Sequence, residues 1–164
     1  MYSIIGQQLS NSSARAIRTR LEILLEDDGF SPEDILKTSV DGLRRVGMSW
    51  GKAQCLHSLA ELVSAGEIDF SKLETLEDEE VVRVLTRVKG IGRWTAEMFL
   101  MFSLGRLDVF PIDDQSIRSS MMHVYELTNE NFRSQAGVIA DKWRPYRTVA
   151  SWYLYRHLDL NITK

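Results

Sequence analysis

A short run with two glycines near the middle of the chain limits its fold most. Residues 85–97 read LTRVKGIGRWTAE, so Gly90 and Gly92 flank a single apolar residue. Apolar residues recur at helical spacing before and after these glycines, which predicts a helix, a tight turn and a second helix. Glycine adopts backbone angles that a Cβ forbids, and it lets another backbone or a ligand approach closely.

The second helix of this hairpin offers a place for an anion. The N-terminus of a helix has unpaired N–H groups and the positive end of the helix dipole, which suit a phosphate. Lys89 and Arg93 add positive charge beside it. A Gly-x-Gly turn alone is weak evidence for a phosphate-binding hairpin, because many helix pairs turn on glycine. The acidic pair Asp113 and Asp114 strengthens this interpretation, with Asp114 22 residues after Gly92.

The rest of the chain also has helical patterning. Apolar spacings of three and four predict helices over residues 14–25, 49–64, 76–88, 95–104 and 113–124, and from Pro145 to about His157. Ser31 and Pro32 are typical of a helix start, and Asp113 or Asp114 is predicted to cap a helix. Residues 108–111 are predicted to be extended, because a residue before proline avoids the helical region. No segment alternates as a strand does, so the predicted fold class is all-α.

Length and composition indicate what kind of protein this chain is. The 164 residues fit one domain over residues 1–164. No apolar run approaches the roughly 18 residues of a membrane span, and the N-terminus lacks a signal-peptide pattern, so we expect a cytoplasmic protein without a membrane partner. Cys55 is the only cysteine and lies in a helical pattern, as a small core residue does. The three histidines are scattered, so the sequence indicates no metal site.

The distribution of charge leaves two interpretations open. The formal net charge of −3 argues mildly against DNA binding, which depends on neutralising phosphates. Acidic residues concentrate in residues 22–34 and 67–80, whereas basic residues concentrate in residues 87–93 and 142–156. This alternation allows one basic face, but an evenly solvated surface explains it equally well.

Five separated stretches resemble the helix-hairpin-helix (HhH-GPD) DNA glycosylase superfamily, and within it the 3-methyladenine DNA glycosylase II group of bacteria and archaea. They are IIGQQLS at residues 4–10, LRRVGMSWGKA at 43–53, VKGIGRWTA at 88–96, DVFPIDD at 108–114 and WRPYRT at 143–148. The resemblance implies a helical fold with a cleft between two lobes. Family members usually have further residues before the first stretch, so we expect the N-terminal part of the family fold to be missing here.

The resemblance implies base flipping followed by hydrolysis of the N-glycosidic bond. Asp114 matches the catalytic aspartate of the family, and Asp113 is its neighbouring rival. Breaking this bond builds positive charge on the sugar, which a carboxylate held beneath the reacting carbon stabilises. Helix capping is the alternative role for either acid, and it is the commoner fate of such a turn.

The same resemblance implies a base pocket. Trp94 stands where bifunctional members carry the lysine that attacks the sugar, which disfavours lyase activity. An aromatic ring there suits a cationic alkylated base, although core packing is the ordinary role of such a tryptophan. Tyr155 matches a second pocket aromatic, and Met98 stands where some relatives have tyrosine.

Contacts with the DNA backbone and the gap in the duplex are implied as well. The residues are Gln8, which would fill the space of the rotated nucleotide, and Lys89, Gly90, Gly92 and Arg93 at the hairpin. Helix hairpins of this family often hold a monovalent cation, so the resemblance admits sodium or potassium at the carbonyls of Val88 and Gly90. It implies no other metal and no organic cofactor.

Together these features predict a monofunctional DNA glycosylase that excises alkylated purines such as 3-methyladenine from double-stranded DNA. It would act in base excision repair as a monomer and leave an abasic site. Two alternatives stay open. A non-catalytic helix-hairpin-helix DNA-binding protein fits the short N-terminus, and a bifunctional glycosylase/lyase fits the hairpin but not Trp94.

Overall fold

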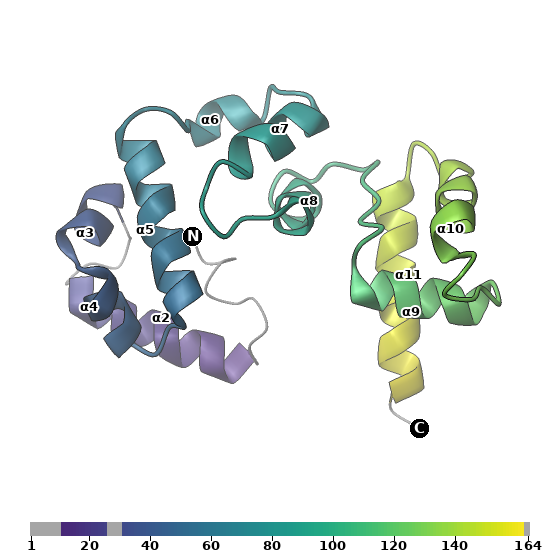
Figure 1. Cartoon of the computed structure of the whole chain (residues 1–164), viewed down its shortest axis with the longest axis horizontal. Coiled ribbons are helices and arrows are strands. Elements are labelled where there is room, and N and C mark those ends of the chain that lie inside the picture. The colour runs from purple at the N-terminus through teal and green to yellow at the C-terminus, as the bar shows by residue number, and fades with distance from the viewer. Residues whose placement is uncertain (1–10, 26–30, 163–164) are drawn as a thin grey trace. The chain divides into compact units, whose positions relative to one another are not determined.

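The computed structural model describes residues 11–25 and 31–162 of the chain. Throughout these residues the regular structure is helical, and turns and loops join the helices (Figure 1). The predicted all-α fold class is therefore confirmed. None of the helices in this described part is long and apolar enough to cross a membrane.

The chain divides into two compact units, unit 1 over residues 1–92 and unit 2 over residues 93–164. The predicted single domain over residues 1–164 and the cleft between two lobes stay predictions. Gln8 lies outside the described residues.

Unit 1 contains six described helices. They are α2 (Asn11–Leu25), α3 (Pro32–Lys37), α4 (Val40–Arg45), α5 (Trp50–Ser64), α6 (Phe70–Leu73) and α7 (Asp78–Leu85). Serines start three of them, because the hydroxyls of Ser31, Ser39 and Ser49 each accept a hydrogen bond from a backbone N–H in the first turn. Pro32 occupies the first position of α3, where its missing N–H costs nothing.

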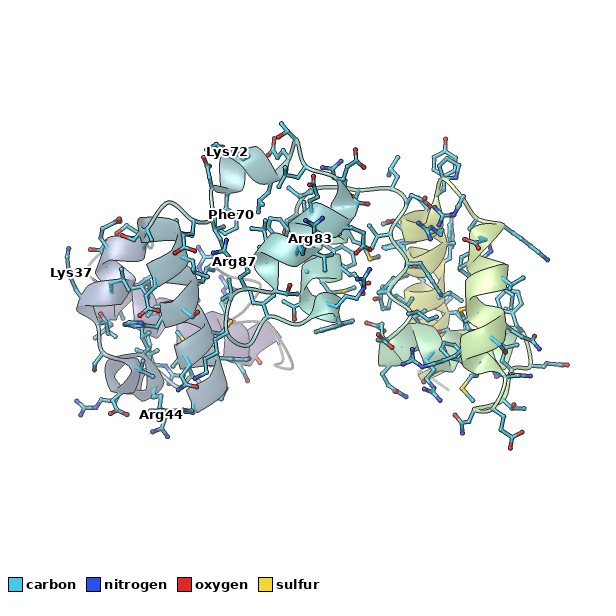
Figure 2. All side chains as sticks on the ribbon, turned by 45° about the horizontal axis from the view of Figure 1, so that its top comes forward. Lys37, Arg44, Phe70, Lys72, Arg83 and Arg87 are labelled. Carbon is cyan, nitrogen blue, oxygen red and sulfur yellow. The ribbon has the colours of Figure 1, made fainter. Side chains whose placement is uncertain are left out.

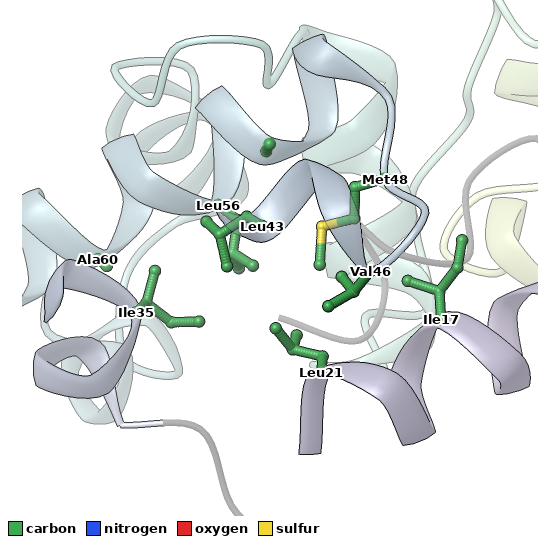
Figure 3. Packing of buried hydrophobic residues seen from close by; sticks show 9 residues of the cluster. Ile17, Leu21, Ile35, Leu43, Val46, Met48, Leu56 and Ala60 are labelled. Atoms are coloured by element: carbon green, nitrogen blue, oxygen red, sulfur yellow. The ribbon is translucent and has the colours of Figure 1, made fainter. Parts of the chain in front are cut away.

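The core of unit 1 forms where α2, α3 and α4 pack against α5 (Figure 3). Its buried side chains are Ile17, Leu21, Ile35, Leu43, Val46, Met48, Ala53, Leu56 and Ala60. Burial of each large aliphatic side chain stabilises the fold by about 1.5–3 kcal/mol before entropy is counted. The core thus anchors α5, which also supports the hairpin turn.

The described part of unit 2 contains four helices, α8 (Arg93–Phe102), α9 (Gln115–Val124), α10 (Phe132–Asp141) and α11 (Arg147–Ile162). Figure 1 shows α9 and α10 beside α11. Their shared core consists of Ile117, Met121, Leu127, Phe132, Ala136 and Leu154. The buried Ser120 hydroxyl donates to the Leu154 carbonyl at 2.7 Å, which fixes α9 against α11.

A polar network, the Asp108 clasp, holds the long connection between α8 and α9. Arg147 donates from Nε to Asp108 Oδ1 at 2.7 Å and from Nη2 to Oδ2 at 3.1 Å, the paired geometry that makes Arg–carboxylate contacts strong. Arg144 adds a bond to Oδ2 at 2.9 Å. Burial raises the pKa of Asp108, but its bonds to Arg147 and the nearby charges outweigh this and leave the pKa below the ordinary value.

Thr148 completes the clasp. Its hydroxyl donates to the Arg106 carbonyl at 2.7 Å and accepts from the Val109 N–H at 3.0 Å, while its own N–H donates to the Leu107 carbonyl at 2.9 Å. Asp108, Arg147 and Thr148 therefore tie segment 106–109, which bends at residues 107 and 108, to the start of α11. This segment leads directly to Asp114.

The predicted helix boundaries need correction around the hairpin. The first hairpin helix ends at Leu85 rather than residue 88, because Val88 donates back to the Leu85 carbonyl in a turn. Val88 is nevertheless buried, so the apolar spacing continues past the helix. The last helix begins at Arg147 rather than Pro145 and extends beyond His157. The short α4 and α6 and the complete α10 were not predicted.

Candidate active site

The hairpin turn rests on α5. The Lys89 N–H donates to the Ser58 hydroxyl at 3.2 Å. Gly90 has φ +91°, and a Cβ there would lie only 3.2 Å from the Cβ of Cys55. Cys55 is buried, as predicted for a small core residue, and burial raises the pKa of its thiol. Gly90 is therefore required by both the backbone conformation and the packing.

Gly92 has a different environment. Gly90 is one of the glycines with positive φ, but Gly92 is not. Apart from Gly92 itself and its two chain neighbours, no described atom lies within 4 Å of the position that its Cβ would take. Neither conformation nor packing within the described chain therefore requires glycine here.

The charged residues of the hairpin differ in their partners. Lys89 is exposed, and among the described residues no ion pair includes it. Arg93 donates from Nε to Oε1 of Glu97 at 3.0 Å, and Glu97 is buried. The structure therefore leaves Lys89 accessible to an anion, whereas Arg93 has an internal partner.

Many other basic side chains of unit 1 are close to acids. Figure 2 labels Lys37, Arg44, Lys72, Arg83 and Arg87, which come from separate elements. Four of them form ion pairs, namely Lys37–Asp34, Arg44–Asp41, Lys72–Asp69 and Arg87–Glu67. Such exposed pairs add little stability, but they offset the positive charge locally. At these positions the evenly solvated surface is the better interpretation.

Asp114 lies at the N-terminus of α9 and is only 6% exposed. Its Oδ1 accepts hydrogen bonds from the N–H groups of Ser116 at 2.8 Å and Ile117 at 3.0 Å. These bonds satisfy two unpaired donors of the helix start. Asp114, rather than Asp113, is therefore the helix cap.

The other oxygen of Asp114 faces two aromatic side chains. The Trp94 indole Nε1 donates to Oδ2 at 2.6 Å, and the Tyr155 hydroxyl donates to the same oxygen at 3.1 Å. The Tyr155 hydroxyl also lies 3.8 Å from the Met98 sulfur. The structure thus brings together the three predicted pocket residues and the predicted catalytic acid, from α8, α9 and α11.

The surroundings keep the Tyr155 phenol protonated. Burial has the largest effect and raises its pKa, and the charge and hydrogen bond of Asp114 raise it further. The charge of Glu97 acts in the same direction. Tyr155 is therefore a hydrogen-bond donor to the carboxylate under ordinary conditions.

Asp113 has a separate environment from its neighbour. It is exposed, and its Oδ1 accepts a hydrogen bond from Arg133 Nη2 at 2.6 Å. Only Asp114 faces the aromatic side chains. The geometry therefore favours Asp114 over Asp113 as the candidate catalytic acid, and the same residue caps α9.

Two features of this site were not predicted from the sequence. Trp94 was expected to offer its ring, but its N–H also binds the acid 20 residues away, a distance that no local spacing rule covers. Glu97 is buried one turn after Trp94. A charged residue within the apolar pattern of α8 was the available signal for it.

Two predictions concern metal ions, one about side-chain ligands and one about a monovalent cation at the hairpin. Within the described ranges, no three His, Cys, Asp or Glu side chains gather in a way that could hold a metal ion. The Val88 carbonyl accepts a hydrogen bond from the Ile91 N–H at 3.0 Å, which leaves one of its two lone pairs for another partner. A monovalent cation at the carbonyls of Val88 and Gly90 stays a prediction.

Comparison with known proteins gives the family. The model of the HhH-GPD superfamily of base excision DNA repair proteins matches residues 1–145. The chain belongs to this superfamily. It is 36% identical to DNA-3-methyladenine glycosylase 1 of Schizosaccharomyces pombe, over 94% of this chain and 68% of that protein. It is 32% identical to the alkylbase DNA glycosidase-like protein mag2 of the same yeast, over 94% of this chain and 74% of that protein.

A solved structure also supports membership of this chain in the HhH-GPD superfamily. The DNA-3-methyladenine glycosidase of Bacillus halodurans has a TM-score of 0.80 and 39% sequence identity, covering 94% of this chain and 71% of that one. Two of these relatives are thus named for action on 3-methyladenine, and the Bacillus halodurans structure shares the fold over 71% of its chain.

The two hairpin glycines should differ in their effect on stability. We expect Gly90→Ala to lower the free energy of unfolding by about 1–3 kcal/mol, because alanine is strained at positive φ and its Cβ would crowd Cys55. Gly92→Ala should cost less than about 1 kcal/mol, as at a helix N-terminus. Urea denaturation of both variants measures this difference, and an equal loss in both would contradict it.

Proposed function

We propose that this HhH-GPD protein is a monofunctional DNA glycosylase that removes alkylated purines of the 3-methyladenine type from double-stranded DNA. The observation that carries the proposal is the buried Asp114 carboxylate, held at the start of α9 and faced by Trp94 and Tyr155. The similarity to named DNA-3-methyladenine glycosylases supports the same substrate class.

Asp114 supplies a fixed negative charge for the reaction. When the N-glycosidic bond breaks, its electron pair leaves with the base, and positive charge develops on the sugar. A carboxylate that is already oriented stabilises this charge without reorganising at the moment of reaction. Water then adds to the sugar and loses a proton to solvent, which leaves an abasic site.

The aromatic side chains suit a cationic leaving base. Trp94 and Tyr155 each carry an electron-rich ring face that attracts a positive charge. The polarizable sulfur of Met98 lies close to the Tyr155 hydroxyl and can contact an aromatic ring. An alkylated purine that already carries positive charge fits this environment, and its departure neutralises it.

The hairpin provides contact with the DNA backbone in this proposal. Gly92 leaves the position of its Cβ open, and Lys89 of the same hairpin is exposed. A phosphate there would meet backbone N–H groups and the positive end of the helix dipole. Gln8 would fill the space of the rotated nucleotide. The protein would act as a monomer, without an organic cofactor.

The first test of this proposal concerns Asp114. Asp114→Asn keeps the shape and can still cap α9, but it removes the charge. We expect the rate of base release from methylated DNA to fall roughly 10²–10³-fold, while DNA binding survives. Single-turnover assays that identify the released base, together with a binding titration, measure both quantities.

Asp113→Asn is the matched control for this test. It removes the neighbouring carboxylate, which is exposed and bound by Arg133, so base release should stay near the wild-type rate. Full activity in Asp114→Asn together with loss of activity in Asp113→Asn would show that Asp113, and not Asp114, is the catalytic acid. A wild-type protein that binds DNA but releases no base would support the non-catalytic alternative.

The product should be an intact strand that carries an abasic site. Lyase chemistry needs an amine that attacks the sugar, and the hairpin offers Trp94 at the position where bifunctional relatives have lysine. Borohydride should therefore trap no covalent adduct between the protein and DNA. A strong adduct that disappears in Lys89→Ala would show lyase chemistry instead.

Gly92 gives a test of the backbone contact. Gly92→Ala places a methyl group in the open space, so we expect DNA affinity to fall about tenfold or more, equally for every sequence. Wild-type affinity should also fall steeply with salt. Gly137→Ala is the control, because its Cβ meets no described atom and it lies in α10. Normal binding by folded Gly92→Ala would refute the phosphate contact.

A further inference from the structure

The hydrogen bonds of Asp114 occupy its whole carboxylate. A carboxylate offers about four acceptor positions, two on each oxygen. Oδ1 accepts from the N–H groups of Ser116 and Ile117, and Oδ2 accepts from Trp94 and Tyr155. The four donors come from three helices, so the direction of the carboxylate is defined from both sides.

The two donors on Oδ2 have different alternatives. The Trp94 indole has a single N–H that is fixed by the ring. The Tyr155 hydroxyl rotates, but its other hydrogen-bond partner within the described residues is the Met98 sulfur at 3.8 Å, a weak acceptor. The Asp114 carboxylate is therefore the stronger of the two acceptors. Because burial and nearby charges raise the pKa of Tyr155, the hydroxyl retains the proton that it donates.

We infer that Tyr155 is a positioning residue for Asp114: its hydroxyl fixes Oδ2, so that the carboxylate charge keeps one orientation toward the reacting sugar. This role differs from stacking on the base, which needs only the ring. The inference rests on the proposed glycosylase function. In this inference the hydroxyl of Tyr155 affects the rate of bond breaking, whereas its ring contacts the base in the pocket.

Tyr155→Phe tests the hydroxyl alone, because it keeps the ring and its packing. We expect the single-turnover rate of base release to fall roughly 10- to 100-fold, as for loss of a hydrogen bond to a charged group. DNA affinity should be unchanged. Tyr153→Phe is the matched control, since Tyr153 lies on the same helix with an exposed ring against Trp152 and should keep the wild-type rate.

A double-mutant cycle shows whether Tyr155 acts through Asp114. The four proteins are the wild type, Tyr155→Phe, Asp114→Asn and the double variant. If the hydroxyl positions the carboxylate, Tyr155→Phe should cause no further loss in the Asp114→Asn background. An equal loss in both backgrounds, or a loss of DNA affinity in place of rate, would overturn the inference.

A measurement without DNA separates this inference from the proposed function. Ultraviolet absorption of tyrosinate, recorded after rapid pH jumps, follows the ionisation of Tyr155 as the difference between each protein and its Tyr155→Phe counterpart. Removing the Asp114 charge should lower the pKa of Tyr155, although burial still raises it.

The outcomes are then distinct. If the wild type releases no base, the proposed function fails, and the absorption measurement alone decides whether Tyr155 binds Asp114. The same holds if base release by Asp114→Asn is too slow for the cycle. A Tyr155 ionisation that is identical with and without the Asp114 charge would overturn the inference in either case.

Discussion

The site depends on the hydrogen bonds of the Asp114 carboxylate, whose two oxygens bind different helices. Oδ1 binds the backbone of α9, and Oδ2 binds side chains from α8 and α11. One buried carboxylate therefore joins three helices of unit 2. Burying such a charge is costly unless its acceptor positions are filled, and here they are. The same bonds that make burial tolerable also define the direction of the charge.

The remainder of unit 2 supports this arrangement. The connection between α8 and α9 has little regular structure, and the hydrogen bonds of the Asp108 clasp fix its conformation. The apolar core between α9 and α11 fixes the two helices that carry Asp114 and Tyr155. In unit 1, α5 supports the hairpin turn in the same way, through Ser58 and Cys55.

Apolar spacing predicted most helices, and the family resemblance predicted the four residues that the structure brings together at Asp114, because both signals are visible in a single chain. Apolar spacing failed at Val88, where a buried residue in a turn continues the helical spacing. It also missed the Trp94–Asp114 bond, which depends on how distant helices meet. Gly90 and Gly92 looked alike in the sequence, and only three-dimensional packing separates their roles.

The position of Trp94 has a consequence for the alignment of the acid. Trp94 lies in the first turn of α8, and its indole N–H binds the carboxylate that caps α9. A shift of this turn would therefore move the N–H that donates to Oδ2, while Oδ1 stays bound to the backbone of α9. The orientation of the charge thus depends on the first turn of a helix that takes no part in the cap.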